Sequence, residues 1–130
     1  MAIDGILDSV RAGLNHERLR LDAASRNIAS ANMAVPAGTS AQRWQAVSTG
    51  AGFDGWLQGA SVQPTESATR QVMDPGNPLA DAQGFVRYPA VDLVQEMTTL
   101  MTASRGYEAN VRAFNLLRGM TLRALEIGAK

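Results

Sequence analysis

Residues 3–31 of the chain read IDGILDSVRAGLNHERLRLDAASRNIASA, and their apolar side chains recur in alternating steps of four and three residues. The series is Ile3, Leu7, Val10, Leu14, Leu21, Ala24, Ile28 and Ala31, and only Glu17 interrupts it. Steps that alternate in this way average about 3.5 residues, which keeps one seam of a helix facing a partner in a left-handed supercoil. The stretch therefore predicts a long amphipathic helix, from about Ile3 to Ala31, that packs against another helix.

The other end of the chain carries a second series with the same period. It consists of Leu93, Met97, Leu100, Ser104, Tyr107, Val111 and Phe114, and it continues less regularly through Leu117, Met120, Leu122, Leu125 and Ile127. Pro89 disfavours helical backbone at the residue before it. Asp92 suits the first turn of a helix, where a carboxylate meets the positive end of the helix dipole. We therefore predict a second helix that starts near Val91–Asp92 and runs to about Ile127.

The residues that break helices are gathered between these two segments. All five prolines lie there, together with most of the glycines. Short strands bounded by turn residues are expected at Trp44–Ser48, Ala60–Gln63, Thr69–Met73 and Phe85–Tyr88. The predicted fold is mainly α. Residues 1–33 and 91–130 form two helices that pair as a coiled coil in one structural unit, and residues 34–90 form a small irregular region with β-hairpins.

The composition narrows the class of protein. A chain of 130 residues forms one domain, or one domain with an extension. Twelve acidic residues balance twelve basic ones, so no overall field attracts nucleic acid, and we expect no nucleic-acid partner. The lack of cysteine excludes disulfides and thiolate metal sites. No apolar run approaches the roughly 20 residues that would insert directly into a membrane, and the first residues lack the features of a cleavable signal peptide.

No group of residues predicts an active site. Gly50-Ala51-Gly52-Phe53-Asp54-Gly55 matches the letters of the dinucleotide fingerprint, but the residues after it are too few to supply the helix that the fingerprint needs, so we expect a flexible loop. His16, the only histidine, lacks the neighbours that catalysis or metal binding requires. Asp74 and Asp81 flank a turn and are expected to cap it. We therefore predict no enzyme, no catalytic residue, no cofactor and no metal.

Several segments resemble one known family. They are Asp74-Pro75-Gly76-Asn77-Pro78-Leu79-Ala80-Asp81, Gly84-Phe85-Val86-Arg87-Tyr88-Pro89, Ala103-Ser104-Arg105-Gly106-Tyr107-Glu108-Ala109-Asn110-Val111, the ending Ala124-Leu125-Glu126-Ile127-Gly128, and, near the start, Ser25-Arg26-Asn27-Ile28-Ala29-Ser30-Ala31-Asn32. Together they cover about half of the chain, in the right order. They closely resemble the bacterial flagellar basal-body rod proteins, above all the proximal component of the rod.

This resemblance implies a role and a location. A rod protein is a structural subunit that packs helically with copies of itself and with other rod proteins, and the rod transmits torque from motor to hook. The resemblance also implies that the two terminal helices pair as a coiled coil lining the inner tube of the rod. It further implies contacts with rod-base and export-gate components, and export by the flagellar type III apparatus without a cleaved signal peptide. The expected location is the periplasm-spanning rod of the basal body.

An interpretation from a different class is a soluble helical adaptor or chaperone that binds a partner helix through its apolar stripe. If the chain is a rod subunit, we expect its assembly interface to comprise Leu14, Leu21, Asn27 and Ile28 of the first helix, and Met97, Leu100, Tyr107, Asn110, Val111 and Phe114 of the second. The two asparagines are included because Asn is a mediocre helix former. Inside a helix its amide can instead satisfy backbone groups or bridge neighbouring helices.

Overall fold

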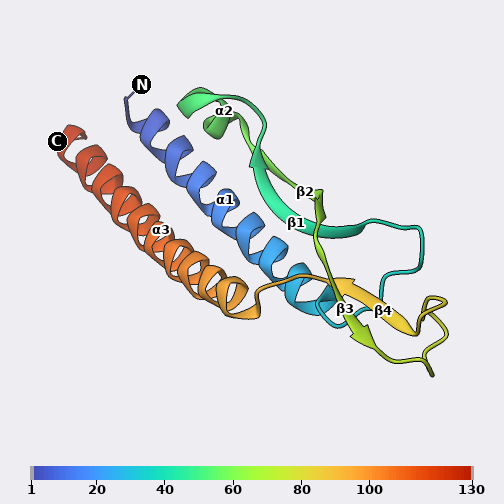
Figure 1. Ribbon diagram of the computed structural model, residues 1–130. Coiled ribbons are helices and arrows are strands. Elements are labelled where there is room, and N and C mark those ends of the chain that lie inside the picture. The colour runs from blue at the N-terminus through green and yellow to red at the C-terminus, as the bar shows by residue number, and fades with distance from the viewer. Residues whose placement is uncertain (1, 130) are drawn as a thin grey trace.

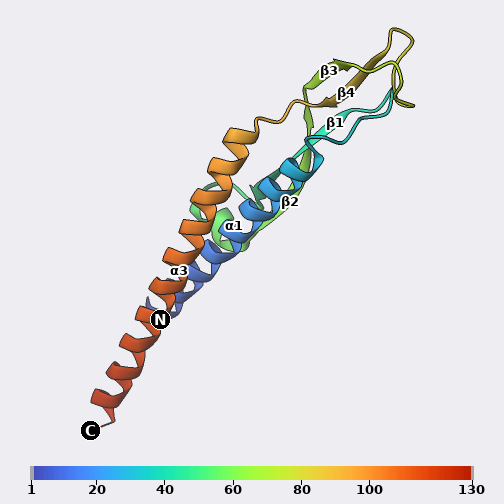
Figure 2. The same ribbon diagram turned by 90° about the horizontal axis from the view of Figure 1, so that it is seen from below.

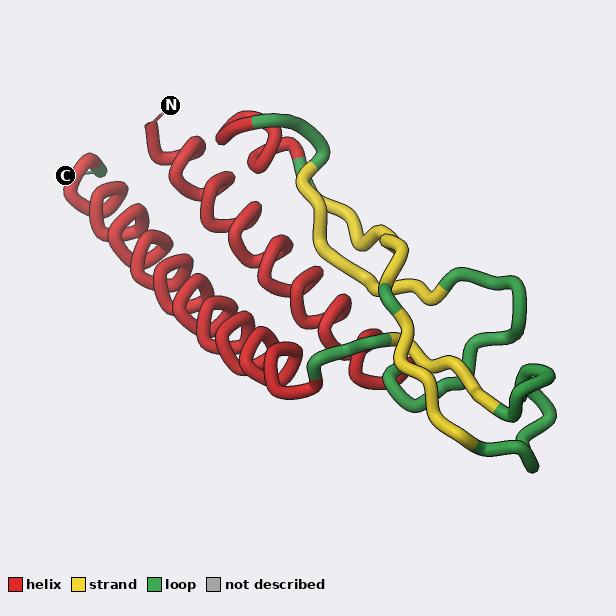
Figure 3. Tube along the Cα trace, in the orientation of Figure 1, coloured by secondary structure: helices red, strands yellow, loops and turns green. Residues whose placement is uncertain are grey.

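The computed structural model describes residues 2–129, and its two long helices lie side by side in antiparallel directions (Figure 1). The first helix, α1, spans Ala2–Ser30, and the last, α3, spans Leu93–Gly128. Between them lie β1 (Ala41–Ser48), α2 (Gly52–Gln58), β2 (Ala60–Ser67), β3 (Thr69–Met73) and β4 (Phe85–Pro89). The prediction of helical ends around a small β-containing middle is thus confirmed (Figure 3). The coiled-coil geometry of the helix pair stays a prediction.

The four strands form two separate antiparallel pairs. In one pair β1 runs against β2, with Ala41 opposite Ser67 and Ser48 opposite Ala60. In the other β3 runs against β4, from Thr69 opposite Pro89 to Met73 opposite Phe85. All four predicted strands are present, and β1 and β2 are longer than expected because β2 continues past Pro64. A proline is tolerated there because each strand of a two-stranded sheet has a free edge.

Helix α1 lies between α3 on one side and the β1–β2 hairpin on the other, whereas the β3–β4 hairpin extends beyond the end of the helix pair (Figure 1). A backbone bridge between Val35 and Arg87 connects the segment after α1 to β4. The turn between β3 and β4 is held by Asp81, whose side chain accepts hydrogen bonds from the backbone N–H groups of Gln83 and Phe85, both at 2.9 Å. The prediction that Asp81 caps this turn is confirmed.

The segment 50–59 corrects one prediction. We expected a flexible loop, and the structure has a short helix, α2, there. Tertiary contacts explain it: the Trp56 ring lies 6.1 Å from the ring of His16 on α1 and stacks on Phe53 at 5.9 Å. The glycine fingerprint still lacks its context, because the strands that flank α2 are antiparallel and form a hairpin, whereas a dinucleotide site needs a parallel βαβ unit.

The core consists almost entirely of small side chains. The buried apolar residues of the described chain are Ala23, Ala24, Ala31, Ala41, Val86 and Ala103. The largest fully buried side chains are those of Val86 and Asn27. Since the hydrophobic stabilisation from burial grows with the apolar area removed from water, alanines contribute little of it. Directional polar contacts therefore help to fix how the elements pack on one another.

Candidate assembly interface

Helices α1 and α3 approach each other through glycine and alanine. An added Cβ at Gly13 of α1 would lie only 2.9 Å from the Asn110 side-chain nitrogen, and one at Gly106 of α3 would lie 2.9 Å from the Glu17 carboxyl carbon. Further along the same face of α3, Ala103 and Glu96 are buried. The inner line of α3, which we define as Glu96, Ala103, Gly106 and Asn110, is thus made of small and polar residues.

Part of the apolar stripe of α3 lies beside this inner line and is exposed. Met97 directly follows the buried Glu96 and is 51% exposed, and Tyr107 follows Gly106 and is 39% exposed. Successive residues of an α-helix are turned by about 100°, so neighbours in sequence point in clearly different directions. Within one chain, Met97 and Tyr107 therefore keep much of their surface outside the contact with α1.

Two exposed apolar surfaces result. The apolar flank of α3, which we define as Leu93, Val94, Met97 and Met101, runs along about the first quarter of the helix, and all four side chains are between 39% and 76% exposed. The apolar tail, which we define as Leu116, Met120, Leu122, Leu125 and Ile127, is more than half exposed at every position. The last turns of α3 extend past the start of α1 (Figure 2), which leaves the end of the tail uncovered. Both surfaces are available to other molecules.

The ten residues expected at the assembly interface are distributed over several environments. Leu14, Leu21, Ile28, Leu100, Asn110, Val111 and Phe114 are half-buried, Asn27 is buried, and Met97 and Tyr107 are exposed. The structure brings Leu14 and Tyr107 together, because both line a shallow groove between α1 and α3. It turns Asn27 toward β1 instead. Whether these ten residues form contacts between chains stays a prediction.

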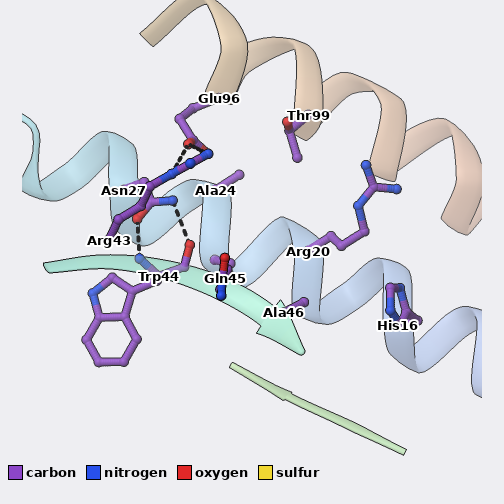
Figure 4. A pocket seen from close by; sticks show the side chains of 11 residues that line it. His16, Arg20, Ala24, Asn27, Arg43, Trp44, Gln45, Ala46, Glu96 and Thr99 are labelled. Carbon is purple, nitrogen blue, oxygen red and sulfur yellow. Dashed lines mark hydrogen bonds and ion pairs between the residues drawn. The ribbon is translucent and has the colours of Figure 1, made fainter. Parts of the chain in front are cut away.

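Asn27 is hydrogen-bonded to the backbone of β1 on both sides of its amide. Its Oδ1 accepts from the Trp44 N–H at 2.7 Å, and its Nδ2 donates to the Trp44 carbonyl at 2.9 Å. The guanidinium of Arg26 lies 4.9 Å from the centre of the Trp44 ring, within the range of a cation–π contact. Asn27 therefore satisfies two backbone groups of the strand and attaches the β1–β2 hairpin to α1 (Figure 4).

An ion pair between β1 and α3 was missed by sequence reasoning. Arg43 donates from Nη2 and Nε to one carboxylate oxygen of Glu96, at 2.7 and 3.1 Å. The Glu96 side chain is buried, whereas that of Arg43 is 45% exposed. The pair borders a pocket of about 230 Å³ between α1, β1 and α3 (Figure 4). One signal was available: Glu96 is the only charged residue between Leu93 and Ser104, so it stands alone on an otherwise uncharged stretch of helix.

Among residues 2–129 no three His, Asp or Glu side chains gather where they could hold a metal ion. Every buried side-chain nitrogen and oxygen in that range has a hydrogen-bond partner. No helix there is both long and apolar enough to span a membrane.

Comparison with known proteins identifies the family. Residues 82–127 match the family described as flagellar basal body rod FlgEFG protein C-terminal. The flagellar basal-body rod protein FlgC of Salmonella typhimurium strain LT2 is 37% identical to this chain, over 98% of the chain and 99% of the relative. FlgC of Aquifex aeolicus is 31% identical, over 97% of each. The chain belongs to the FlgC family of flagellar basal-body rod proteins.

The resemblance to rod proteins inferred from the sequence is therefore confirmed. In this FlgC-family chain the matched segment contains β4 and nearly all of α3. It thus includes the inner line that contacts α1 and also the apolar flank and tail. FlgC of Bacillus subtilis is 44% identical over 53% of the chain and 46% of the relative.

Proposed function

We propose that this chain is a structural subunit of the bacterial flagellar basal-body rod. Relatives that align with nearly all of it carry that name. The single structural observation that carries the proposal is the exposed apolar surface of α3, formed by the flank and the tail. Exposed apolar patches mark sites of association between proteins, and methionine, which occurs in both surfaces, is enriched in the centres of protein interfaces.

We further propose how the subunit sits in the rod. The α1–α3 pair supercoils as a coiled coil and lines the inner tube, and the apolar flank contacts copies of the chain and other rod proteins. Residues 1–33 and 91–130 act as one unit, and residues 34–90 form a separate outer region. The expected interface residues named above, including Leu21, Val111 and Phe114, contact neighbouring chains. The exposure of the flank and the antiparallel contact between α1 and α3 support this arrangement.

The remaining parts of the proposal follow from the family. The subunit reaches its place through the flagellar type III export apparatus, contacts rod-base and export-gate components, and transmits torque from motor to hook without catalysing a reaction. These steps are supported by the relatives' place in the basal-body rod.

The proposal is tested by substituting residues of the apolar flank in living cells. In a strain lacking this gene, the double variant Met97→Asp/Met101→Asp should restore neither motility nor basal bodies visible by electron microscopy, because a charge buried without a partner in an interface is unfavourable by several kcal/mol. Thr102→Asp is the matched control, since it places one charge at an exposed position of the same helix outside the flank, and it should restore motility.

Two further measurements make the result interpretable. Circular dichroism of the purified double variant should match that of the unsubstituted chain, which shows that assembly and not folding was lost. Detection of the unsubstituted chain in purified basal bodies separates a rod subunit from a soluble adaptor. Normal motility of the double variant, or absence of the chain from basal bodies, would overturn the proposal.

A further inference from the structure

Two contacts between α1 and α3 each pair a glycine with a larger polar side chain. In the first, α1 contributes the glycine: Gly13 is buried, and the side chain of Asn110 on α3 lies directly over it. In the second, α3 contributes the glycine: Gly106 leaves room for the side chain of Glu17. We call these two contacts the glycine rungs. Each helix thus supplies the glycine at one rung and the larger side chain at the other.

Glu17 is held in place by its own helix. Arg20 donates to both carboxylate oxygens of Glu17, at 3.1 and 3.4 Å, and the Glu17 side chain is only 20% exposed. The ion pair within α1 therefore orients the Glu17 carboxylate independently of α3. This also accounts for Glu17 as the one interruption of the apolar series of α1, because it occupies a position where the neighbouring helix offers a glycine.

From these contacts we infer that the glycine rungs set the register in which α1 closes on α3. The two residues contributed by each helix are spaced four apart, which is about one helical turn. A slip of one turn in one direction would place Glu17 against Asn110, side chain on side chain. A slip in the other direction would place Gly13 against Gly106 and leave a void, and unfilled space between packed elements is destabilising. Only the observed register matches a side chain with a space at both rungs.

The apolar flank and the buried alanines cannot supply this information within one chain. The apolar flank of α3 lies outside the contact, and the buried alanines are alike in size and shape. In other paired helices a polar residue in the seam selects register at the expense of stability. The inference goes beyond the proposed function, since it concerns how a single chain closes. It is tested on the purified protein, so its failure leaves the rod proposal untouched.

The chain provides matched controls in its other helical glycines. An added Cβ at Gly5 of α1 or Gly119 of α3 would meet nothing within 4 Å. Gly119→Leu should therefore raise Tm, because leucine is a much better helix former than glycine. Gly106→Leu introduces the same side chain on the same helix and should lower Tm. Adding Glu17→Ala to Gly106→Leu should restore much of the loss by vacating the space, whereas adding Asn110→Ala should not.

A register readout separates this role from general destabilisation. Because the chain has no cysteine, engineered pairs can be cross-linked without interference. Ala24 and Thr99 line the same pocket from α1 and α3, so Ala24→Cys/Thr99→Cys reports the observed register. Ala24→Cys/Gln95→Cys reports a slip of one turn, the slip that would bring residue 106 over Gly13.

The expected result is a change in the ratio of the two cross-link yields. The unsubstituted background and Gly119→Leu should favour the first pair. Gly106→Leu should favour the second, and Glu17→Ala added to it should return the preference to the first. If Gly106→Leu changes neither Tm nor the ratio relative to Gly119→Leu, the inference is wrong. It is equally wrong if Gly106→Leu lowers Tm while the first pair stays preferred.

Discussion

The two sides of α3 differ in composition and in what they contact. Toward α1 the helix presents Glu96, Ala103, Gly106 and Asn110, and toward the outside it presents the large apolar side chains of the flank. A contact through small residues brings two backbones close together but buries little apolar area, so polar partners define it. Burying a flank of large apolar side chains is strongly favourable. Because the hydrophobic effect is non-directional, such burial alone does not select one orientation of the partner. The chain thus closes on itself through small and polar residues and leaves its apolar flank exposed.

Among the polar contacts that hold the elements of the chain together, the one made by Asn27 is expected to matter most, so Asn27→Ala should have the largest effect. The change leaves both the N–H and the carbonyl of Trp44 without their partner, and an unsatisfied buried group costs about 1–3 kcal/mol. We expect a loss of about 3 kcal/mol in the free energy of unfolding, measured by urea denaturation. Asn115→Ala, at an exposed position of α3, should change it by less than about 0.5 kcal/mol. Equal effects of the two substitutions would contradict the account.

Arg43→Ala tests the ion pair that joins β1 to α3. The substitution leaves the buried Glu96 carboxylate unpaired, and breaking a buried pair is strongly destabilising. Water can reach the half-exposed Arg43 position, so we expect the smaller loss of about 2 kcal/mol. Glu96→Gln combined with Arg43→Ala should recover part of it by removing the charge. Arg11→Ala is the control, because its pair with Asp8 is exposed on both sides and such pairs contribute little.

Asp92→Ala tests the N-cap of α3, the helix that carries both the inner line and the apolar flank. The Asp92 side chain accepts hydrogen bonds from the backbone N–H groups of Val94 and Gln95, at 3.0 and 3.2 Å. Removing an N-cap of this type lowers the free energy of unfolding by about 1 kcal/mol. Asp92→Asn should retain most of the stability, since its side-chain oxygen can still accept these bonds. Thermal denaturation that shows the two variants equally destabilised would exclude the cap as the cause.

The smallest effect on stability is expected from substitutions in the exposed apolar tail of α3. Leu125→Ser and Ile127→Ser replace residues of the apolar tail that are 65% and 77% exposed. The isolated chain therefore gains little stability from either side chain. Each substitution should change the free energy of unfolding by less than about 0.5 kcal/mol. A clear loss of stability in a protein shown to be monomeric by light scattering would mean that the tail is covered within the chain.

The sequence predicted the elements better than their arrangement. The apolar period and the placement of proline located both helices and all four strands, because each of those signals acts over a few neighbouring residues. Helix α2 was missed since it depends on the contact between Trp56 and His16, which are far apart in the chain. A seven-residue segment carries too little local preference to form a helix without such a contact.

The site shows the same limit. The apolar series of α3 includes Met97 and Tyr107, but a one-dimensional pattern does not reveal which face of a helix its own chain covers. In a helical pattern Gly13 and Gly106 indicate only poor helix formers, whereas the structure uses both as space for a partner side chain. The Arg43–Glu96 pair joins residues separated by 53 positions, and no spacing rule connects such residues before the fold is known.

The antiparallel contact of α1 with α3 has a consequence for the order of folding. It joins the two ends of the chain, so a loop containing every other element must close before the helices can pair, and closing long loops slows folding. The β1–β2 and β3–β4 hairpins join near neighbours in sequence and can form first. Pulse-labelled hydrogen exchange during refolding should therefore show protected amides in the strands before α1 and α3 become protected. On a ribosome, likewise, α1 is synthesised long before the part of α3 that it contacts.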